Sequence, residues 1–166
     1  APTDVYVDDD FSSEDAGSHT WQVDAFSTVA DGVNSVATNG TVHVAPGLYE
    51  TTDNTAILRP MTLLGPNGSD PEDPSLSAIV RRTNCSYTIS VVADDVTVSG
   101  FTVEQGNPED YQSCGPTIRV LAVQSSNPTF AIHGVTITHN NVGGGYRGIM
   151  LRGDSGSGTV TFNKVH

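Results

Sequence analysis

The chain has 166 residues and a formal net charge of -12, from 19 acidic residues against 7 basic ones. This length corresponds to about one domain with a buried core. Such an acidic surface repels nucleic acid phosphates and anionic membranes, so we expect neither as a partner. No apolar run approaches the roughly 20 residues of a membrane span.

The first twenty residues predict a short strand followed by an acidic loop. Polar and apolar residues alternate over residues 4–8, which is typical of a strand. The acidic run that follows contains Asp8, Asp10 and Asp15, whose carboxylates are candidates for calcium ligands. The competing interpretation is a solvated acidic segment, because a calcium loop spaces its ligands around a glycine turn.

Residues 21–40 predict an amphipathic helix. Asp24 or Ser27 can cap its start, and Asn39-Gly40 supplies a stop signal. We expect this helix to lie across one end of the fold and to cover apolar side chains there. The apolar residues at helical spacing are Phe26, Val29, Ala30, Val33, Val36 and Ala37.

Four later segments repeat one pattern: residues 61–65, 96–103, 135–142 and 158–165. Their third position is always aliphatic, as Leu63, Val98, Ile137 or Val160, and the eighth, where present, is Val103, Val142 or Val165. The apolar alternation slips by one residue near the middle, so each strand must turn a corner there. The repeat predicts an all-β chain, with a parallel β-helix of about four to five coils over residues 41–166 and a short helix capping its N-terminal end, all in one domain.

The sixth repeat position predicts a short side-chain ladder. Asn140 and Asn163 occupy it in the last two copies, and stacked asparagines can bond to each other along the axis. Phe101 stands at the same position one copy earlier, so the ladder should not extend that far.

Cys85 and Cys114 each lie three residues before a β-rich segment, at residues 88–93 and 117–123. If these segments stack on consecutive coils, equivalent positions lie about 4.8 Å apart, which suits a disulfide. We therefore expect a Cys85–Cys114 bridge and an extracytoplasmic location. The alternative is a pair of buried free thiols.

Residues 26–33, 40–50 and 61–65 resemble the opening of secreted, right-handed parallel β-helix proteins of the pectin-lyase-like superfamily. In those proteins an N-terminal helix caps the first coil, a strand ends in a Pro-Gly-x-Tyr turn, and a leucine-rich strand follows. The resemblance implies a right-handed coil and an extracellular, cell-surface location. It does not imply one activity, because the superfamily holds lyases, esterases, epimerases, adhesins and surface-layer proteins.

Two enzyme classes of this superfamily can be compared with the chain. The Gln-Asp-Thr and Asp-Phe-x-x-Gly segments of pectin methylesterases are absent, and Glu50 directly follows Gly47-Leu-Tyr49 where one more residue is expected. Pectate lyases use calcium held by aspartates and an arginine base. The candidates for such a patch are Asp94, Asp95, His139, Arg147, Arg152 and Asp154. The simpler interpretation is a polar turn with solvated or paired arginines.

Asn39, Asn67 and Asn84 begin acceptor sequences for N-glycosylation, relevant only in a host that glycosylates.

The unpaired strands at the two ends of the predicted stack suggest a function in assembly. A parallel coil leaves backbone groups unpaired at each end, and the sequence stops just after a strand, so either further coils or another subunit should pair there. We expect a secreted structural or adhesive protein that stacks end to end into a surface fibre or layer, with no cofactor unless calcium binds. The rival is a polysaccharide-active, lyase-like enzyme or a carbohydrate-binding module of the same fold. The expected contact residues between copies are Val5, Val7, Val160, Phe162 and Val165.

Overall fold

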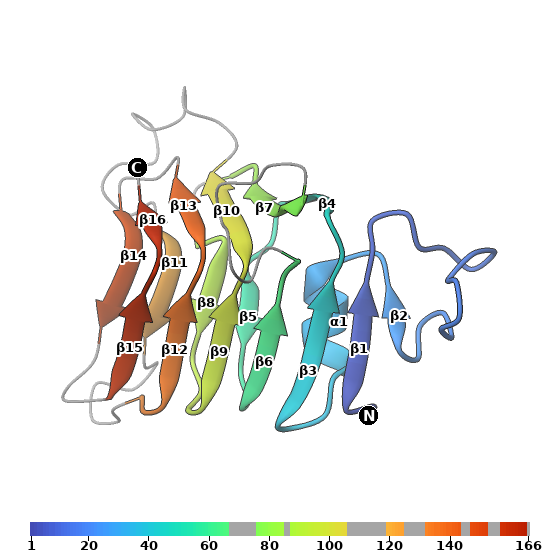
Figure 1. Cartoon of the computed structure of the whole chain (residues 1–166), viewed down its shortest axis with the longest axis horizontal. Coiled ribbons are helices and arrows are strands. Elements are labelled where there is room, and N and C mark those ends of the chain that lie inside the picture. Colours follow the sequence, from blue (N-terminus) through green and yellow to red (C-terminus); the bar gives the residue numbers. More distant parts are fainter. Residues whose placement is uncertain are drawn as a thin grey trace.

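The computed structural model describes residues 1–66, 76–84, 87–105, 119–124, 132–143, 147–152 and 157–165. For residues 105, 119–124, 147, 151 and 152 it describes the backbone alone. Within these ranges the chain consists mostly of β-strands with one short helix, and every pairing between its strands is parallel (Figure 1). The predicted all-β class is confirmed.

Consecutive strands from β3 onward enter three sheets in turn. The sheets have seven, five and four strands, in the orders β15-β12-β9-β6-β3-β1-β2, β16-β13-β10-β7-β4 and β14-β11-β8-β5. We call one passage through the three sheets a rung. The seven-stranded sheet runs across the front of Figure 1, and the four-stranded sheet lies behind it.

The strand bounds follow the chain from β1 to β16. They are β1 (Asp4–Val7), β2 (Ala25–Phe26), β3 (Gly40–Val44), β4 (Gly47–Thr51), β5 (Thr55–Ile57), β6 (Met61–Leu64), β7 (Ala78–Arg82), β8 (Ile89–Val91), β9 (Val96–Ser99), β10 (Phe101–Gln105), β11 (Arg119–Gln124), β12 (Val135–Thr138), β13 (Asn141–Gly143), β14 (Arg147–Arg152), β15 (Gly158–Thr161) and β16 (Lys164–Val165).

The register of the strands confirms the alignment of the four repeats. Leu63 lies opposite Val98, Val98 opposite Ile137, and Ile137 opposite Val160, so the third repeat position forms one column across the seven-stranded sheet. The eighth position forms a second column, of Val103, Val142 and Val165, in the five-stranded sheet. Leu63, Val98 and Ile137 are fully buried. The repeat is therefore the sequence record of a stacked apolar core.

The predicted corner lies at the fifth repeat position. Gly100, His139 and Phe162 there have left-handed backbones, with φ of 85°, 53° and 52°. Each sits between a strand of the seven-stranded sheet and the next strand of the five-stranded sheet. Gly65 is equivalent, and a Cβ on it would overlap the backbone carbonyl of Gly100. The chain thus changes sheet at this position, which explains the slip in its apolar alternation.

The helix is shorter than the sequence predicts. Helix α1 (Val29–Ser35) is capped by Thr28, whose Oγ1 accepts the N–H of Asp31 at 3.1 Å. The predicted caps Asp24 and Ser27 are wrong: residues 25–26 form β2 before the helix begins, and Thr28 rather than Ser27 is at the cap position. The helix buries Val29, Gly32 and Val33 toward the interior of the first rung.

The N-terminal strand is not a free edge. Strand β1 pairs with β3 on one side and with β2 on the other. Val5 and Val7 are 0% and 1% exposed, and they pack in the core. The expectation that these two valines pair across a joint between copies is therefore wrong, because both are buried and β1 pairs with β3 along its length and with β2 at Tyr6 and Val7.

Candidate functional site

The inward column of aliphatic residues reaches the surface at the last rung. Val160 is 40% exposed although its column partners are buried, and Phe162 and Val165 are 75% and 53% exposed. Among the described strands, β15 and β16 are the last of their sheets. An open hollow of about 710 Å³ lies beside them, lined by Gly148, Ile149, Met150, Val160, Thr161, Phe162, Asn163 and Val165. We call β14, β15 and β16 with these side chains the C-terminal edge.

The predicted asparagine ladder ends at this edge. Asn140 is fully buried, and its Nδ2 donates to the carbonyl oxygens of Val98 at 3.0 Å and Thr138 at 2.9 Å. The Asn140 Oδ1 accepts the N–H of Phe101 at 3.1 Å, and Asn163 Oδ1 in turn accepts the N–H of Asn140 at 3.0 Å. The ladder is confirmed, and Phe101 joins it through its backbone. Each rung thus satisfies a corner N–H of the rung before it.

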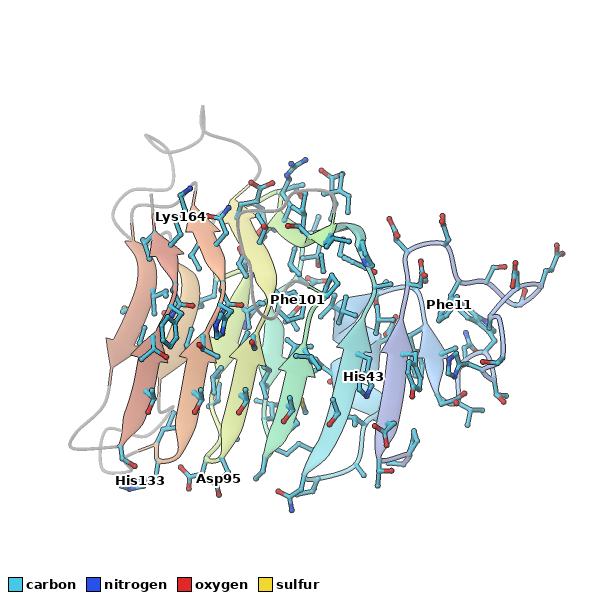
Figure 2. All side chains as sticks on the ribbon, viewed as in Figure 1. Phe11, His43, Asp95, Phe101, His133 and Lys164 are labelled. Atoms are coloured by element: carbon cyan, nitrogen blue, oxygen red, sulfur yellow. The ribbon has the colours of Figure 1, made fainter. Side chains whose placement is uncertain are left out.

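The proposed catalytic patch is not assembled within the described residues. Asp94 Oδ1 accepts the N–H of His133 at 2.7 Å, and the N–H of Asp95 donates to the carbonyl of His133 at 2.9 Å. Figure 2 shows Asp95 and His133 side by side at one edge of the sheet. His139 follows β12 at the opposite end of that strand from His133.

The remaining catalytic candidates belong to the last full rung. His139 stacks on Phe162 with ring centroids 5.1 Å apart, and both backbones are left-handed. Arg147 and Arg152 are the end residues of β14, and Asp154 lies outside the described residues. The two aspartates and the histidine therefore do not form one acid–base group.

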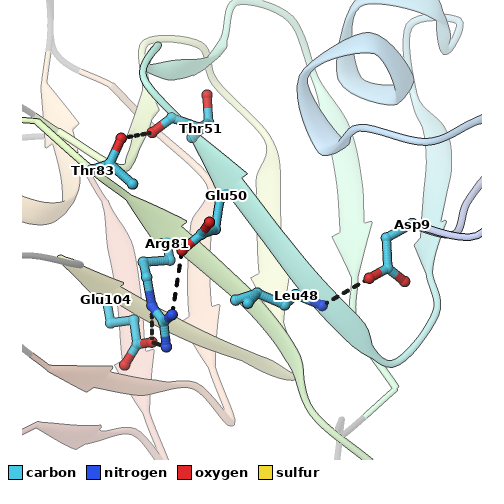
Figure 3. Close-up of polar contacts among 7 residues, drawn as sticks. All are labelled: Asp9, Leu48, Glu50, Thr51, Arg81, Thr83 and Glu104. Atoms are coloured by element: carbon cyan, nitrogen blue, oxygen red, sulfur yellow. Dashed lines mark hydrogen bonds and ion pairs between the residues drawn. The ribbon is translucent and has the colours of Figure 1, made fainter.

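The acidic N-terminal loop uses its carboxylates to shape its own turns. Asp8 Oδ1 accepts the N–H of Asp10 at 3.0 Å, and Asp15 Oδ1 accepts the N–H of Gly17 at 3.1 Å. Asp9 Oδ2 accepts the N–H of Leu48 at 3.2 Å and so ties the loop to β4 (Figure 3). Within the described part of the chain, no group of three or more metal-ligating side chains comes together.

The sequons and cysteines fall partly outside the described residues. Asn39 is exposed, with φ of 63°, and Nδ2 of Asn84 donates to the Thr52 carbonyl at 2.7 Å. Asn67, Cys85 and Cys114 lie outside the described residues.

The segments after the two cysteines do stack, as β8 on β11, but with a different register. Ile89 lies opposite Leu121, whereas equal spacing from the two cysteines would place it opposite Ile118. The disulfide remains a prediction.

A charged ladder crosses the outer face of the five-stranded sheet (Figure 3). Arg81 Nε and Nη2 lie 2.7 and 2.6 Å from Glu104 Oε1, and Nη1 lies 3.4 Å from Glu50 Oε1. Hydrogen bonding to Glu104 raises the pKa of Arg81. One cation thus joins the three neighbouring strands β4, β7 and β10.

An aromatic and histidine row covers the outer face near β1. Tyr6 stacks between His19 and His43, with centroids 3.9 and 4.9 Å away. His43 Nε2 lies 3.0 Å from Asp4, and this hydrogen bond lowers the pKa of the carboxyl group. The N–H of Thr20 donates to Asp24 at 2.6 Å and lowers the pKa of that carboxyl group, with a smaller contribution from His19. The row anchors the N-terminal loop to the sheet.

A column of threonines crosses the outer face of the seven-stranded sheet. Its members are in register on five strands: Thr41, Thr62, Thr97, Thr136 and Thr159. A second column two residues further along contains Ser99, Thr138 and Thr161. Sequence reasoning missed this feature because it followed the inward positions, although the second position of every repeat is threonine.

Comparisons of the chain with protein-family models, curated proteins and solved structures found no match. Within the described ranges, the single helix is too short to cross a membrane.

Proposed function

We propose that the chain is a right-handed parallel β-helix with an extracellular structural or adhesive role, and that copies associate through the C-terminal edge. The fold proposal is supported by the three sheets visited in turn, by the all-parallel pairing and by the corner at the fifth repeat position. Its handedness follows the strong preference of parallel crossovers. The extracellular location comes from the resemblance of residues 26–33, 40–50 and 61–65.

The observation that carries the association is the exposure of core positions on the last strands. Val160, Phe162 and Val165 present apolar surface beside the backbone edges of β15 and β16. An edge of this kind is a template for a further strand, and burial of an aromatic side chain contributes about 2 kcal/mol. The asparagine ladder also indicates that a partner should supply a hydrogen-bond acceptor. The backbone N–H groups of Phe101 and Asn140 each donate to an asparagine side-chain oxygen of the following rung. A partner should therefore bring both apolar side chains and an acceptor.

The geometry favours pairing of like edges over a continuous fibre. At the other end of the stack, β2 covers β1, α1 covers the interior, and Asp9 holds the loop onto β4. A head-to-tail filament needs two complementary open ends, whereas a two-fold dimer needs one self-complementary patch. For residues 1–166, a second copy placed tail to tail is the occupant we propose for the C-terminal edge; in a longer chain, further rungs would cover the same edge.

Sedimentation velocity of the full chain over a wide concentration range tests this proposal. We expect a concentration-dependent dimer. Phe162→Asn removes the exposed ring and keeps a residue that tolerates a left-handed backbone, so it should weaken the dimer by about tenfold or more without unfolding the monomer. Leu58→Asn is the matched control. Leu58 is 66% exposed and follows β5, which is at the opposite end of the four-stranded sheet from β14, so this substitution should leave the dimer unchanged.

Monomers at every concentration, or equal effects of the two substitutions, would contradict association through the C-terminal edge. The alternative of a polysaccharide-active enzyme depends on Asp94, Asp95 and His139, which lie at opposite ends of a strand. No described cluster favours it.

A further inference from the structure

The outer face of the seven-stranded sheet carries a regular array of hydroxyl groups. Thr62, Thr97, Thr136 and Thr159 are consecutive in one column, and Thr138 and Thr161 continue a second column beside Thr136 and Thr159. The hydroxyls of the first column make no hydrogen bond to the described part of the protein, so they remain available to a ligand. The Thr138 and Thr161 hydroxyls lie 3.4 Å apart.

The strand geometry sets the spacing of this array in two directions. Neighbouring strands lie about 4.8 Å apart, and residues i and i+2 on one strand lie about 6.7 Å apart. Because threonine is β-branched, its side-chain torsion is restricted. The first column thus repeats at the strand spacing, close to one repeat of the oxygen atoms on the prism face of hexagonal ice. In the second column the Thr138 and Thr161 hydroxyls approach each other to 3.4 Å, and Thr138 Oγ1 lies 2.9 Å from His139 Nδ1.

The chemistry around the array also suits ordered water better than a sugar or an ion. The outward positions on β6, β9, β12 and β15 include no charged residue, in a chain of which 16% of residues are charged. Asp4 on β1 lies opposite Thr41 at one end of the column, and Asp94 and Asp95 belong to the turn before β9. A charged side chain would hold its own hydration shell and disturb a water lattice, whereas threonine offers one hydroxyl and one methyl per position. Within the described ranges, the stacked rings lie beside the array and not at its outward positions on β6, β9, β12 and β15. They are Tyr6 with His19 and His43 near β1, and Phe162 with His139 at the corner after β15.

We propose that this threonine face binds ice. β-propensity alone would explain a β-branched residue at each position of the threonine column. A sheet face that is only exposed to solvent does not require hydroxyl groups in register on five strands. The proposal rests on the register of the seven-stranded sheet and does not depend on association through the C-terminal edge.

Partition of the full chain into a slowly growing ice front tests this proposal, with inhibition of ice recrystallisation as a second readout. We expect the chain to be enriched in the ice, whereas an acidic globular protein of similar size is excluded. Thr136→Lys places a charge at the centre of the array and should lower the enrichment about tenfold, which corresponds to about 1.4 kcal/mol. Thr136→Val keeps the shape without the hydroxyl and should give a smaller loss.

The matched control is Thr102→Lys, on β10 in the five-stranded sheet, between Ile79 and Asn141. It changes net charge by the same amount on a central strand of another face, and it should leave the enrichment intact. Circular dichroism of each variant separates loss of the face from loss of the fold. Exclusion of the wild-type chain from ice, equal losses for the two lysine variants, or retention on crystalline cellulose or chitin without enrichment in ice would each overturn the proposal.

Discussion

Asn140 shows how one side chain can join three rungs at a corner. Its amide contacts the carbonyls of Val98 and Thr138, the N–H of Phe101 and the side chain of Asn163. The left-handed corner at His139 leaves nearby backbone groups without strand partners, and the asparagine supplies both the donor and the acceptor that they need. Since the residue is fully buried, these bonds form away from water, where an unmet polar group is most costly.

We therefore predict that Asn140→Ala lowers the free energy of unfolding by about 3 kcal/mol, because it leaves several buried backbone groups unsatisfied. Asn141→Ala is the control on the next residue, since the Oδ1 of Asn141 is buried without a partner among the described residues. Its cost should be about 1 kcal/mol or less. Urea unfolding followed by circular dichroism measures both values, and equal costs would show that the ladder does not stabilise the corner.

At the scale of elements, the first turn of α1 depends on a single hydroxyl. Thr28 Oγ1 accepts the N–H of Asp31, and the same hydroxyl donates to Asp31 Oδ2 at 2.6 Å. Asp31 also lies in the first turn, where a negative charge interacts favourably with the helix dipole. The helix has seven residues, too few to be stable alone, so its cap and its packing over Val7 and Val42 must hold it in place.

We expect Thr28→Ala to destabilise the protein by about 1 kcal/mol, the usual contribution of a threonine cap. Ser27→Ala tests the cap that the sequence suggests, and it should cost less than about 0.5 kcal/mol. Thermal unfolding of the two variants compares them directly. A larger effect of Ser27→Ala would place the helix start one residue earlier than the structure does.

These two neighbouring residues illustrate why sequence reasoning succeeds for some elements and not for others. The columns of Leu63, Val98 and Ile137 could be predicted because apolar alternation repeats in every copy and one face must be buried. The N-cap of the helix could not be predicted, because serine and threonine are both good caps. The presence of β2 before the helix decides between Ser27 and Thr28. Pairing of β1 on both edges likewise depends on a two-residue strand too short to be recognised.

The candidate site was only partly visible in the sequence, for a related reason. Phe162 could be chosen as a contact residue from the sequence because it is an apolar residue at the corner position of its repeat copy, and its side chain is exposed. The separation of Asp94 from His139 could not be predicted. Their spacing along the chain does not show at which end of a strand each residue lies. The threonine column required attention to outward positions, which carry no burial signal.

For the whole molecule, the charge of -12 acts against a compact stack. The one described ladder of opposite charge, at Arg81, joins three strands but leaves most carboxylates without a basic partner, since the chain has 19 acidic residues and 7 Lys and Arg. Mutual repulsion of so many carboxylates destabilises the folded state over distances longer than a salt bridge. Stability should therefore depend on screening by salt.

We predict that the unfolding temperature rises as NaCl is increased from about 10 mM to about 1 M, over which the Debye length falls from about 30 Å to about 3 Å. The rise should be several degrees, because about 1 kcal/mol shifts the midpoint of a domain of this size by roughly 2–4 °C. The double substitution Asp10→Asn and Glu14→Gln changes the charge from -12 to -10 at two exposed positions, so it should reduce the dependence on salt. A flat or falling midpoint in differential scanning calorimetry would mean instead that attractive pairs such as Arg81 with Glu104 outweigh the repulsion, since salt weakens both.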